Sequence, residues 1–253
     1  MEQRRFLPDF STIPAEVAQQ ARLLFLNYPN NPTGAVADLQ FFAEAVDFAR
    51  QYDLLICHDN AYSEVTFDGY RAPSILQVAG ASEVAVEFNS LSKTYNMTGW
   101  RIGMAVGNAA ALAGLGVIKT NIDSGAWKAV QRAAVVALRG PQDHLQEING
   151  LYQRRRDLIV AGLRRLGWAI PDPPQATFYF WIPVPAGYSS MEFAARLLDE
   201  AGIIVPPGIG YGQCGEGYVR IALTTAEARI HEAFVRMERC GIHYSAAHPA
   251  NRA

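Results

Sequence analysis

One short segment of the chain carries the groups that a phosphorylated aldehyde would need. Ser90-Leu91-Ser92-Lys93 offers a nucleophilic amine and two hydroxyl groups, and Arg101 follows eight residues after the lysine. An amine forms an imine with an aldehyde, and a guanidinium and a hydroxyl together bind a phosphate. A lysine by itself is usually a solvated surface residue, but this one coincides with the hydroxyls and the arginine. We therefore predict that Lys93 binds the aldehyde and that Ser90 and Arg101 bind the phosphate.

Two earlier clusters supply groups that suit an aromatic ring bearing a basic nitrogen and a phenolic oxygen. They are Asn30-Asn31-Pro32-Thr33-Gly34 and His58-Asp59-Asn60-Ala61-Tyr62. A carboxylate such as that of Asp59 keeps a pyridinium nitrogen protonated, while Tyr62 and Asn31 can donate hydrogen bonds to the ring oxygen. The alternatives are ordinary ones: Asp59 can make a local turn, and Asn31 alone can be a turn residue.

A second arginine stands in a strand that is otherwise apolar. Arg220 lies within Val219-Arg220-Ile221-Ala222-Leu223, and burying a guanidinium without an anionic partner is costly. A substrate carboxylate is one candidate partner and an internal Asp or Glu is the other. The glycine-rich residues 208–217 precede this strand and offer a backbone that can close over a ligand. They contain a GxGxG string without a strand–helix context, so we reject a dinucleotide site there.

Each polar cluster follows a short apolar run that predicts a buried strand. These runs are Leu23–Leu26 before Asn31, Leu54–Cys57 before Asp59 and Val84–Phe88 before Ser90. A fourth strand is predicted at 102–107 and a helix at 38–51. Strands that alternate with helices indicate an α/β fold with a mostly parallel sheet, and open sheets of this kind bind ligands at the carboxyl ends of their strands.

The second half of the chain reads as more helical. We expect helices over 126–138 and 143–166, and strands over 178–182 and 219–223. Two further helices are indicated by their capping residues. One is capped by Ser189 with Glu192 and ended by Gly202, and the last is capped by Thr224 with Glu227. We place the boundary at Gly140-Pro141. This predicts a large cofactor-binding domain over 1–140 and a small α+β domain over 141–253.

Composition narrows the class of protein. The 253 residues carry a net charge of −2 and are 50% apolar, so a core is expected and nucleic-acid binding has no electrostatic footprint. No apolar run reaches the roughly 20 residues of a membrane span, and the polar start carries no signal-peptide pattern. Cys57, Cys214 and Cys240 lack metal-binding spacing, which indicates free thiols, no metal and a cytoplasmic location.

Together, these motifs resemble the class I/II aminotransferases of fold type I, which depend on pyridoxal 5′-phosphate. The resemblance covers nearly the whole chain. It implies that Lys93 is the Schiff-base lysine, that Asp59 pairs with the pyridine nitrogen, and that Tyr62 and Asn31 contact the ring oxygen. It further implies that Ser90 and Arg101 bind the cofactor phosphate and that Arg220, with Asn31, binds the substrate. Relatives of this kind are homodimers.

Finer features are similar to the LL-diaminopimelate aminotransferases. They are Val84–Arg101, Asn121-Ile122-Asp123-Ser124-Gly125 and Gly215–Arg220. This similarity implies a ping-pong transfer of an amino group between LL-2,6-diaminopimelate and 2-oxoglutarate in lysine biosynthesis, with Lys93 as the acid and base of the proton shift. The alternatives on the same fold are an aspartate-type, alanine-type or other amino-acid aminotransferase, or a lyase with the same cofactor.

The chain also departs from the resembled pattern. Such proteins carry an N-terminal arm, a glycine-containing phosphate loop and an aromatic residue that stacks on the cofactor ring, and all of these precede the point that corresponds to Met1. We therefore expect an N-terminally truncated fragment whose four first strands remain contiguous. A further hypothesis follows, namely an inactive remnant that binds the cofactor weakly or not at all and aggregates through exposed strand edges.

Overall fold

A computed structural model describes residues 6–244 of the chain. The chain divides into two compact units. One contains the residues up to Asn31 together with Ala35–Glu147, and the other contains Pro32–Gly34 with the residues from Ile148 onward. The division between the units falls inside a long helix, later than the predicted boundary at Gly140-Pro141.

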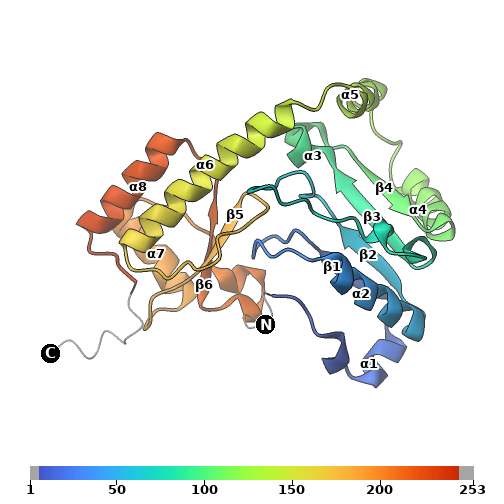
Figure 1. The fold of residues 1–253 in the computed structure, drawn as a ribbon, viewed down its shortest axis with the longest axis horizontal. Coiled ribbons are helices and arrows are strands. Elements are labelled where there is room, and N and C mark those ends of the chain that lie inside the picture. The colour runs from blue at the N-terminus through green and yellow to red at the C-terminus, as the bar shows by residue number, and fades with distance from the viewer. Residues whose placement is uncertain (1–5, 245–253) are drawn as a thin grey trace. The chain divides into compact units, whose positions relative to one another are not determined.

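The first unit is built on a four-stranded sheet with the order β1-β2-β3-β4 (Figure 1). Strand β1 spans Leu23–Asn27, β2 spans Leu55–Asp59, β3 spans Ala85–Ser90 and β4 spans Gly103–Gly107. The first three strands are parallel, and β4 runs antiparallel to β3. All four strands lie where the sequence predicted them, and they are contiguous, as expected.

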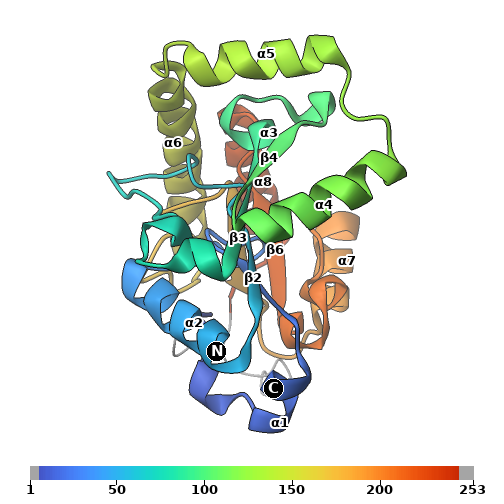
Figure 2. The same cartoon turned by 90° about the vertical axis from the view of Figure 1, so that its right-hand side faces the viewer.

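Helix α2, Leu39–Tyr52, covers one face of this sheet (Figures 1 and 2). Phe42, Val46 and Ala49 are fully or almost fully buried and share a core with Ile56 of β2 and Ala85 of β3. Asp38 begins the helix by accepting a hydrogen bond from the Phe41 amide over 2.8 Å. The helix predicted at 38–51 is therefore present, with these three side chains in the core, whereas Leu39 in its first turn remains 45% exposed.

Short elements surround the sheet. They are η2 Phe10–Thr12, α1 Ala15–Gln20, η3 Ile75–Gln77, η4 Ala81–Glu83, α3 Leu91–Thr94 and η5 Thr98–Trp100. Two longer helices follow β4, namely α4 Ala109–Ile122 and α5 Lys128–Arg139 (Figure 2). Helix α4 buries none of its residues, although Val117, Ile118 and Ile122 are apolar.

The second unit pairs a small sheet with three helices. Strands β5, Tyr179–Pro183, and β6, Tyr218–Ala222, are antiparallel. Around them lie most of α6, His144–Arg165, with α7, Ser190–Ala201, and α8, Glu227–Arg239. The turns η6, Gly208–Tyr211, and η7, Gln213–Gly215, connect α7 to β6. The buried core includes Leu163, Trp168, Ile182, Phe193 and Leu223.

One of the two predicted capping signals in this unit is confirmed and the other is wrong. Ser189 and Glu192 form a capping box at the start of α7, and Gly202 ends that helix in the left-handed conformation. Helix α8 instead begins after Ala226, without a side-chain cap. Its predicted cap, Thr224, lies in the preceding turn, because the neighbouring Leu223 amide still donates to the Phe178 carbonyl oxygen.

Two further features bear on the class of protein. Among residues 6–244, no helix combines the length and the apolar character needed to cross a membrane. Cys57, Cys214 and Cys240 are free thiols, as the sequence predicted.

Candidate functional site

The carboxyl ends of β1, β2 and β3 lie side by side at one edge of the sheet. Asn27 is in register with Asp59, and Asp59 is in register with Phe88. The amide of Asn60 continues this pairing by donating to the Phe88 carbonyl oxygen over 2.9 Å. Each of the three predicted polar clusters includes or closely follows one of these ends. The parallel register therefore brings to one edge segments that are about 30 residues apart in sequence.

Asp59 is the last residue of β2, and its side chain is exposed at this edge. One carboxylate oxygen accepts a hydrogen bond from the Ala61 amide over 3.3 Å, which is the local turn interaction that the sequence left open. Tyr62 follows in the same turn and is buried, with its carbonyl oxygen accepting from the Val65 amide. The carboxylate thus faces solvent while its backbone is held by the turn.

Ser90 and Lys93 lie at the junction of β3 with the short helix α3. The Ser90 hydroxyl accepts a hydrogen bond from the Ser92 amide over 3.2 Å and so caps α3. Lys93 is half-buried, between the buried residues Ser92 and Thr94. This turn of helix fixes the backbone of Lys93 immediately beyond the sheet edge.

Arg101 ends η5 in a backbone conformation that is uncommon for a residue with a side chain. Its φ angle is +53°, in the left-handed region, and its guanidinium donates to the Thr98 carbonyl oxygen over 3.2 Å. The Thr98 hydroxyl in turn donates to the Ser92 carbonyl oxygen over 3.1 Å. The segments that carry Ser90, Lys93 and Arg101 are therefore linked by hydrogen bonds.

Asn31 is held by a residue that sequence reasoning missed. The Asn31 amide donates to Oδ1 of Asn27 over 2.9 Å, and Nδ2 of Asn27 donates to the Asp59 carbonyl oxygen over 2.9 Å. One side chain thus connects the turn after β1 to the end of β2. Asn27 could have been found from the sequence, because it is a polar residue directly after an apolar run.

Arg220 belongs to the second unit, in β6. Its guanidinium carbon lies 4.0 Å from the centroid of the Tyr179 ring and 5.1 Å from that of Tyr211. Such cation–π contacts stabilise a guanidinium away from bulk water. Burial raises the pKa of Tyr211, and the nearby Arg220 charge opposes that shift. Sequence reasoning considered only anionic partners for this arginine and missed the two tyrosines.

The glycine-rich segment before β6 is folded against itself. A methyl group added at Gly208 would lie 1.9 Å from the Gly215 carbonyl oxygen, and one added at Gly215 would lie 2.1 Å from the Gly208 carbonyl oxygen. These two glycines therefore permit a close approach of backbone to backbone. That contact explains their presence without a ligand.

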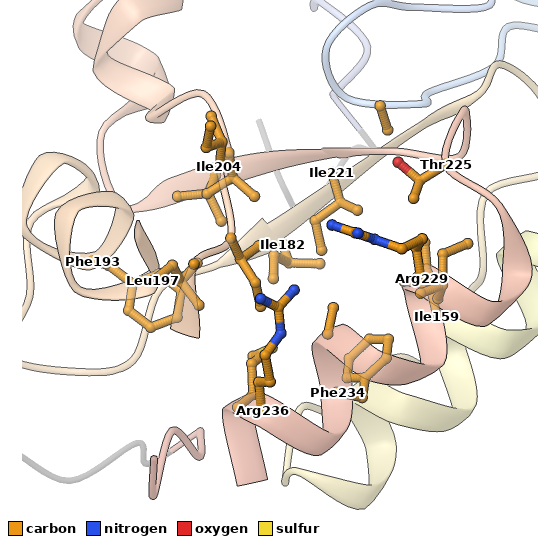
Figure 3. A pocket seen from close by; sticks show the side chains of 18 residues that line it. Ile159, Ile182, Phe193, Leu197, Ile204, Ile221, Thr225, Arg229, Phe234 and Arg236 are labelled. Carbon is orange, nitrogen blue, oxygen red and sulfur yellow. The ribbon is translucent and has the colours of Figure 1, made fainter. Parts of the chain in front are cut away.

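The second unit also contains a mainly apolar pocket of about 230 Å³, on the opposite face of β6 from Arg220 (Figure 3). Val219 and Ile221 line it, and side chains on a strand alternate between faces, so Arg220 between them points away. Figure 3 shows Ile182, Phe234 and Arg236 among the other lining side chains. None of the sequence-predicted site residues lines this pocket.

The mixed α/β sheet is that of the fold type I pyridoxal-phosphate-dependent transferases, a class expected to have a lysine beyond one strand and an acidic residue at the end of the neighbouring strand. Solved structures of similar fold agree. Substrate-bound BacF from Bacillus subtilis superposes with a TM-score of 0.92 at 34% identity, covering 97% of this chain and 62% of that one. A probable N-succinyldiaminopimelate aminotransferase from Thermus thermophilus gives a TM-score of 0.87 at 40% identity, covering 92% of this chain and 62% of that one.

The chain belongs to the family of class I and II aminotransferases, whose family model matches residues 3–237. Pyridoxal 5′-phosphate is the cofactor of this family. LL-diaminopimelate aminotransferase 2 of Trichormus variabilis is 58% identical over 243 residues, which are 96% of this chain and 62% of that protein. LL-diaminopimelate aminotransferase of Moorella thermoacetica is 60% identical over 234 residues, covering 92% of this chain and 60% of the relative. The chain thus spans about three fifths of the length of these relatives.

Proposed function

We propose that this protein is an aminotransferase that uses pyridoxal 5′-phosphate to move an amino group between LL-2,6-diaminopimelate and 2-oxoglutarate. The observation that carries the proposal is the 58% identity, over 96% of the chain, to a relative named LL-diaminopimelate aminotransferase 2. The donor groups at the sheet edge fit the cofactor, because they combine an amine, an exposed carboxylate, a hydroxyl and a guanidinium. A small amino acid and a 2-oxo acid are the partners that follow from this chemistry.

The bound cofactor supplies an electron-withdrawing ring that makes the α-hydrogen of an amino acid acidic. In our proposal, the Lys93 amine is the nucleophile that holds the cofactor aldehyde. The Lys93 amine would also serve as the base that removes the proton from the substrate α-carbon and as the acid that returns a proton. Its place on α3, a short helix that the Ser90 hydroxyl caps directly after β3, supports this role because that turn positions the lysine beyond the sheet edge.

The remaining residues are proposed to bind and orient. The exposed Asp59 carboxylate keeps the ring nitrogen protonated, and Tyr62 and Asn31 donate to the ring oxygen. Ser90 and Arg101 bind the phosphate, for which the left-handed backbone at Arg101 is a supporting observation. Arg220, held against Tyr179 and Tyr211, binds the substrate α-carboxylate.

We also propose a homodimer and a cytoplasmic location. The dimer is supported by the exposed apolar side chains of α4, since an apolar surface of this kind is typical of an interface. The cytoplasm is supported by the three free thiols. We propose, finally, that residues 1–140 belong to a large cofactor-binding domain and residues 141–253 to a smaller domain.

The test is a titration of the purified chain with pyridoxal 5′-phosphate, followed by borohydride reduction and peptide mapping. We expect a saturable visible absorbance band and a reduced adduct on Lys93. Lys93→Ala should lose both, whereas Lys128→Ala, which removes an exposed lysine at the start of α5, should keep both. A chain without a saturable band would contradict the proposal and favour an inactive remnant.

Donor profiling then tests the substrate. We expect transfer from LL-2,6-diaminopimelate to 2-oxoglutarate to exceed transfer from aspartate or alanine. A preference for either of these, or a lyase reaction, would show that the substrate assignment is wrong while the cofactor chemistry holds.

A further inference from the structure

A buried histidine and a buried glutamate lie behind the sheet edge that carries the predicted cofactor residues. His58 is 0% exposed and Glu87 is 5% exposed. Nδ1 of His58 lies 3.3 Å from Oε2 of Glu87. The two residues occupy β2 and β3, and the His58 ring also contacts Phe42 of α2, with 4.8 Å between the ring centroids. Burying a charged side chain is costly unless it has a partner, so the presence of these two residues in the core needs an explanation.

Several hydrogen bonds hold the buried carboxyl group of Glu87. Oε2 accepts from the Ser74 hydroxyl over 2.6 Å and from the Ile75 amide over 3.2 Å, and Oε1 accepts from Nδ2 of Asn89 over 3.0 Å. Burial alone would raise the pKa of Glu87, but side-chain hydrogen bonds outweigh burial and lower that pKa to about 2. The side chains responsible are those of His58, Ser74, Asn89 and Asn60.

Both ring nitrogens of His58 have a partner at hydrogen-bond distance. Nε2 lies 3.0 Å from the Tyr28 carbonyl oxygen, which can only accept a hydrogen bond, so Nε2 carries a proton. Nδ1 lies 3.3 Å from Oε2 of Glu87. An imidazolium paired with an ionised carboxylate satisfies both contacts of the ring.

This pair connects the three strand ends that carry the predicted cofactor residues. Through Tyr28, His58 contacts the segment after β1 that leads to Asn31. His58 itself precedes Asp59, and Glu87 contacts Asn89, which precedes Ser90. Side chains alternate along a strand, so His58 and Glu87 support these ends from the face opposite to Asp59 and Ser90.

We propose that the His58–Glu87 ion pair is a positioning device that holds Asn31, Asp59 and Ser90 in register at the sheet edge. Neither residue touches the cofactor in this proposal. The role of the pair in cofactor binding rests on the proposed function, whereas the charge of the two side chains does not. One experiment therefore tests the charge and a second tests the role in binding.

The first experiment measures the charge of His58 in the cofactor-free chain by long-range ¹H–¹⁵N NMR at neutral pH. His58→Gln identifies the signals of His58 by their loss. We expect both ring nitrogens of His58 to show the shifts of protonated nitrogens. A signal from one unprotonated ring nitrogen would overturn the proposal, whether or not the chain binds a cofactor.

The second experiment compares Glu87→Gln with the wild type in binding pyridoxal 5′-phosphate. Loss of an outer-shell partner of a metal ligand typically costs about 10–100-fold in affinity, and we expect a loss of about tenfold for this residue, which orients the binding groups in the same way. The pH midpoint of the visible band, which reports protonation of the imine nitrogen on Lys93, should also move upward. A displaced Asp59 leaves the ring nitrogen less protonated, so the ring withdraws fewer electrons from the imine and the pKa of the imine rises. Lower stability alone would change the folded fraction and leave this midpoint where it is.

Glu83→Gln is the matched control, because it removes a carboxylate whose side chain is 73% exposed. We expect it to bind the cofactor as the wild type does. Equal affinity and an equal midpoint in Glu87→Gln would overturn the positioning role. Failure of the wild type to bind would instead contradict the proposed function, and the NMR result would still decide the charge of the pair.

A neutral double variant covers the case in which Glu87→Gln does not fold. His58→Gln with Glu87→Gln leaves no unpaired buried charge, so it should fold. The double variant lacks the imidazole ring that joins Tyr28 to residue 87. We therefore expect it to lose as much affinity for pyridoxal 5′-phosphate as Glu87→Gln does. Wild-type affinity in the folded double variant would overturn the proposal.

Discussion

The side-chain amide of Asn27 joins the ends of two neighbouring strands by donating to the carbonyl oxygen of Asp59 over 2.9 Å. The same side chain accepts the Asn31 amide. Asn27 is therefore a shared hydrogen-bond partner of two segments for which cofactor roles are proposed.

Asn27→Ala should lower the free energy of unfolding and weaken cofactor binding. It removes both hydrogen bonds and leaves backbone groups unsatisfied, at a cost of about 1–3 kcal/mol. Urea unfolding with a cofactor titration measures the two effects. Asn121→Ala is the control, since it removes an exposed side chain that bonds only within α4. Equal losses in both variants would contradict a role for Asn27 at the site.

Gly103→Ala should destabilise the first unit. A methyl group there would lie 2.7 Å from the Asn89 carbonyl oxygen, across the pairing of β3 with β4, and overpacking of this kind costs about 1–3 kcal/mol. Gly114→Ala, in α4, meets nothing within 4 Å and should stabilise the helix by about 0.5–1 kcal/mol. Thermal unfolding compares the two, and a gain in stability at Gly103 would refute this account.

Glu87 should make stability depend on pH in a defined window. The pKa of its carboxyl group falls from an ordinary 4.5 to about 2 on folding. Its contribution is therefore complete above pH 4.5 and is lost as the pH falls toward 2. Over this window the wild type should lose up to about 3 kcal/mol more than Glu87→Gln. Denaturant unfolding at several pH values tests this, with Glu83→Gln expected to follow the wild type. Parallel curves for the wild type and Glu87→Gln would show that Glu87 contributes nothing.

Tyr179→Leu should weaken substrate binding by releasing Arg220. The guanidinium loses the ring at 4.0 Å, a contact worth about 0.5–2 kcal/mol. We expect a higher KM for the amino-acid substrate with a smaller change in kcat. Tyr179→Phe keeps the ring and should stay near the wild type. If Tyr179→Phe were impaired as strongly, the hydroxyl and not the ring would be the important group.

Ile118→Glu should reduce self-association. Ile118 is 59% exposed on α4, beside the exposed Val117 and Ile122, and a charge there is costly to bury in an interface. Sedimentation velocity measures the change in oligomeric state. Met191→Glu on α7 is the control, because Met191 is also exposed, at 57%. An unchanged oligomer in Ile118→Glu would exclude this face of α4 from the proposed dimer.

Local pattern accounts for much of the fold. The six predicted strands and helix α2 are present within a residue or two, because a strand or an amphipathic helix is set by its own run of apolar side chains. The Ser189–Glu192 cap is also local, since its partners are three residues apart. Helix α4 had no such signal, because its apolar residues do not concentrate on one buried face. The polar groups at the strand ends were likewise visible in the sequence, as residue types out of place beside apolar runs.

The tertiary structure decided which polar groups meet. Asn27 and Asp59 are 32 residues apart, and His58 and Glu87 are 29 apart. Their contacts depend on the parallel register of β1, β2 and β3, which no local pattern specifies. The antiparallel direction of β4, the tyrosines around Arg220 and the turn that displaces Thr224 from its expected cap depend in the same way on distant partners. Sequence alone therefore determined which reactive groups this chain carries, and long-range backbone pairing determined which of them lie together.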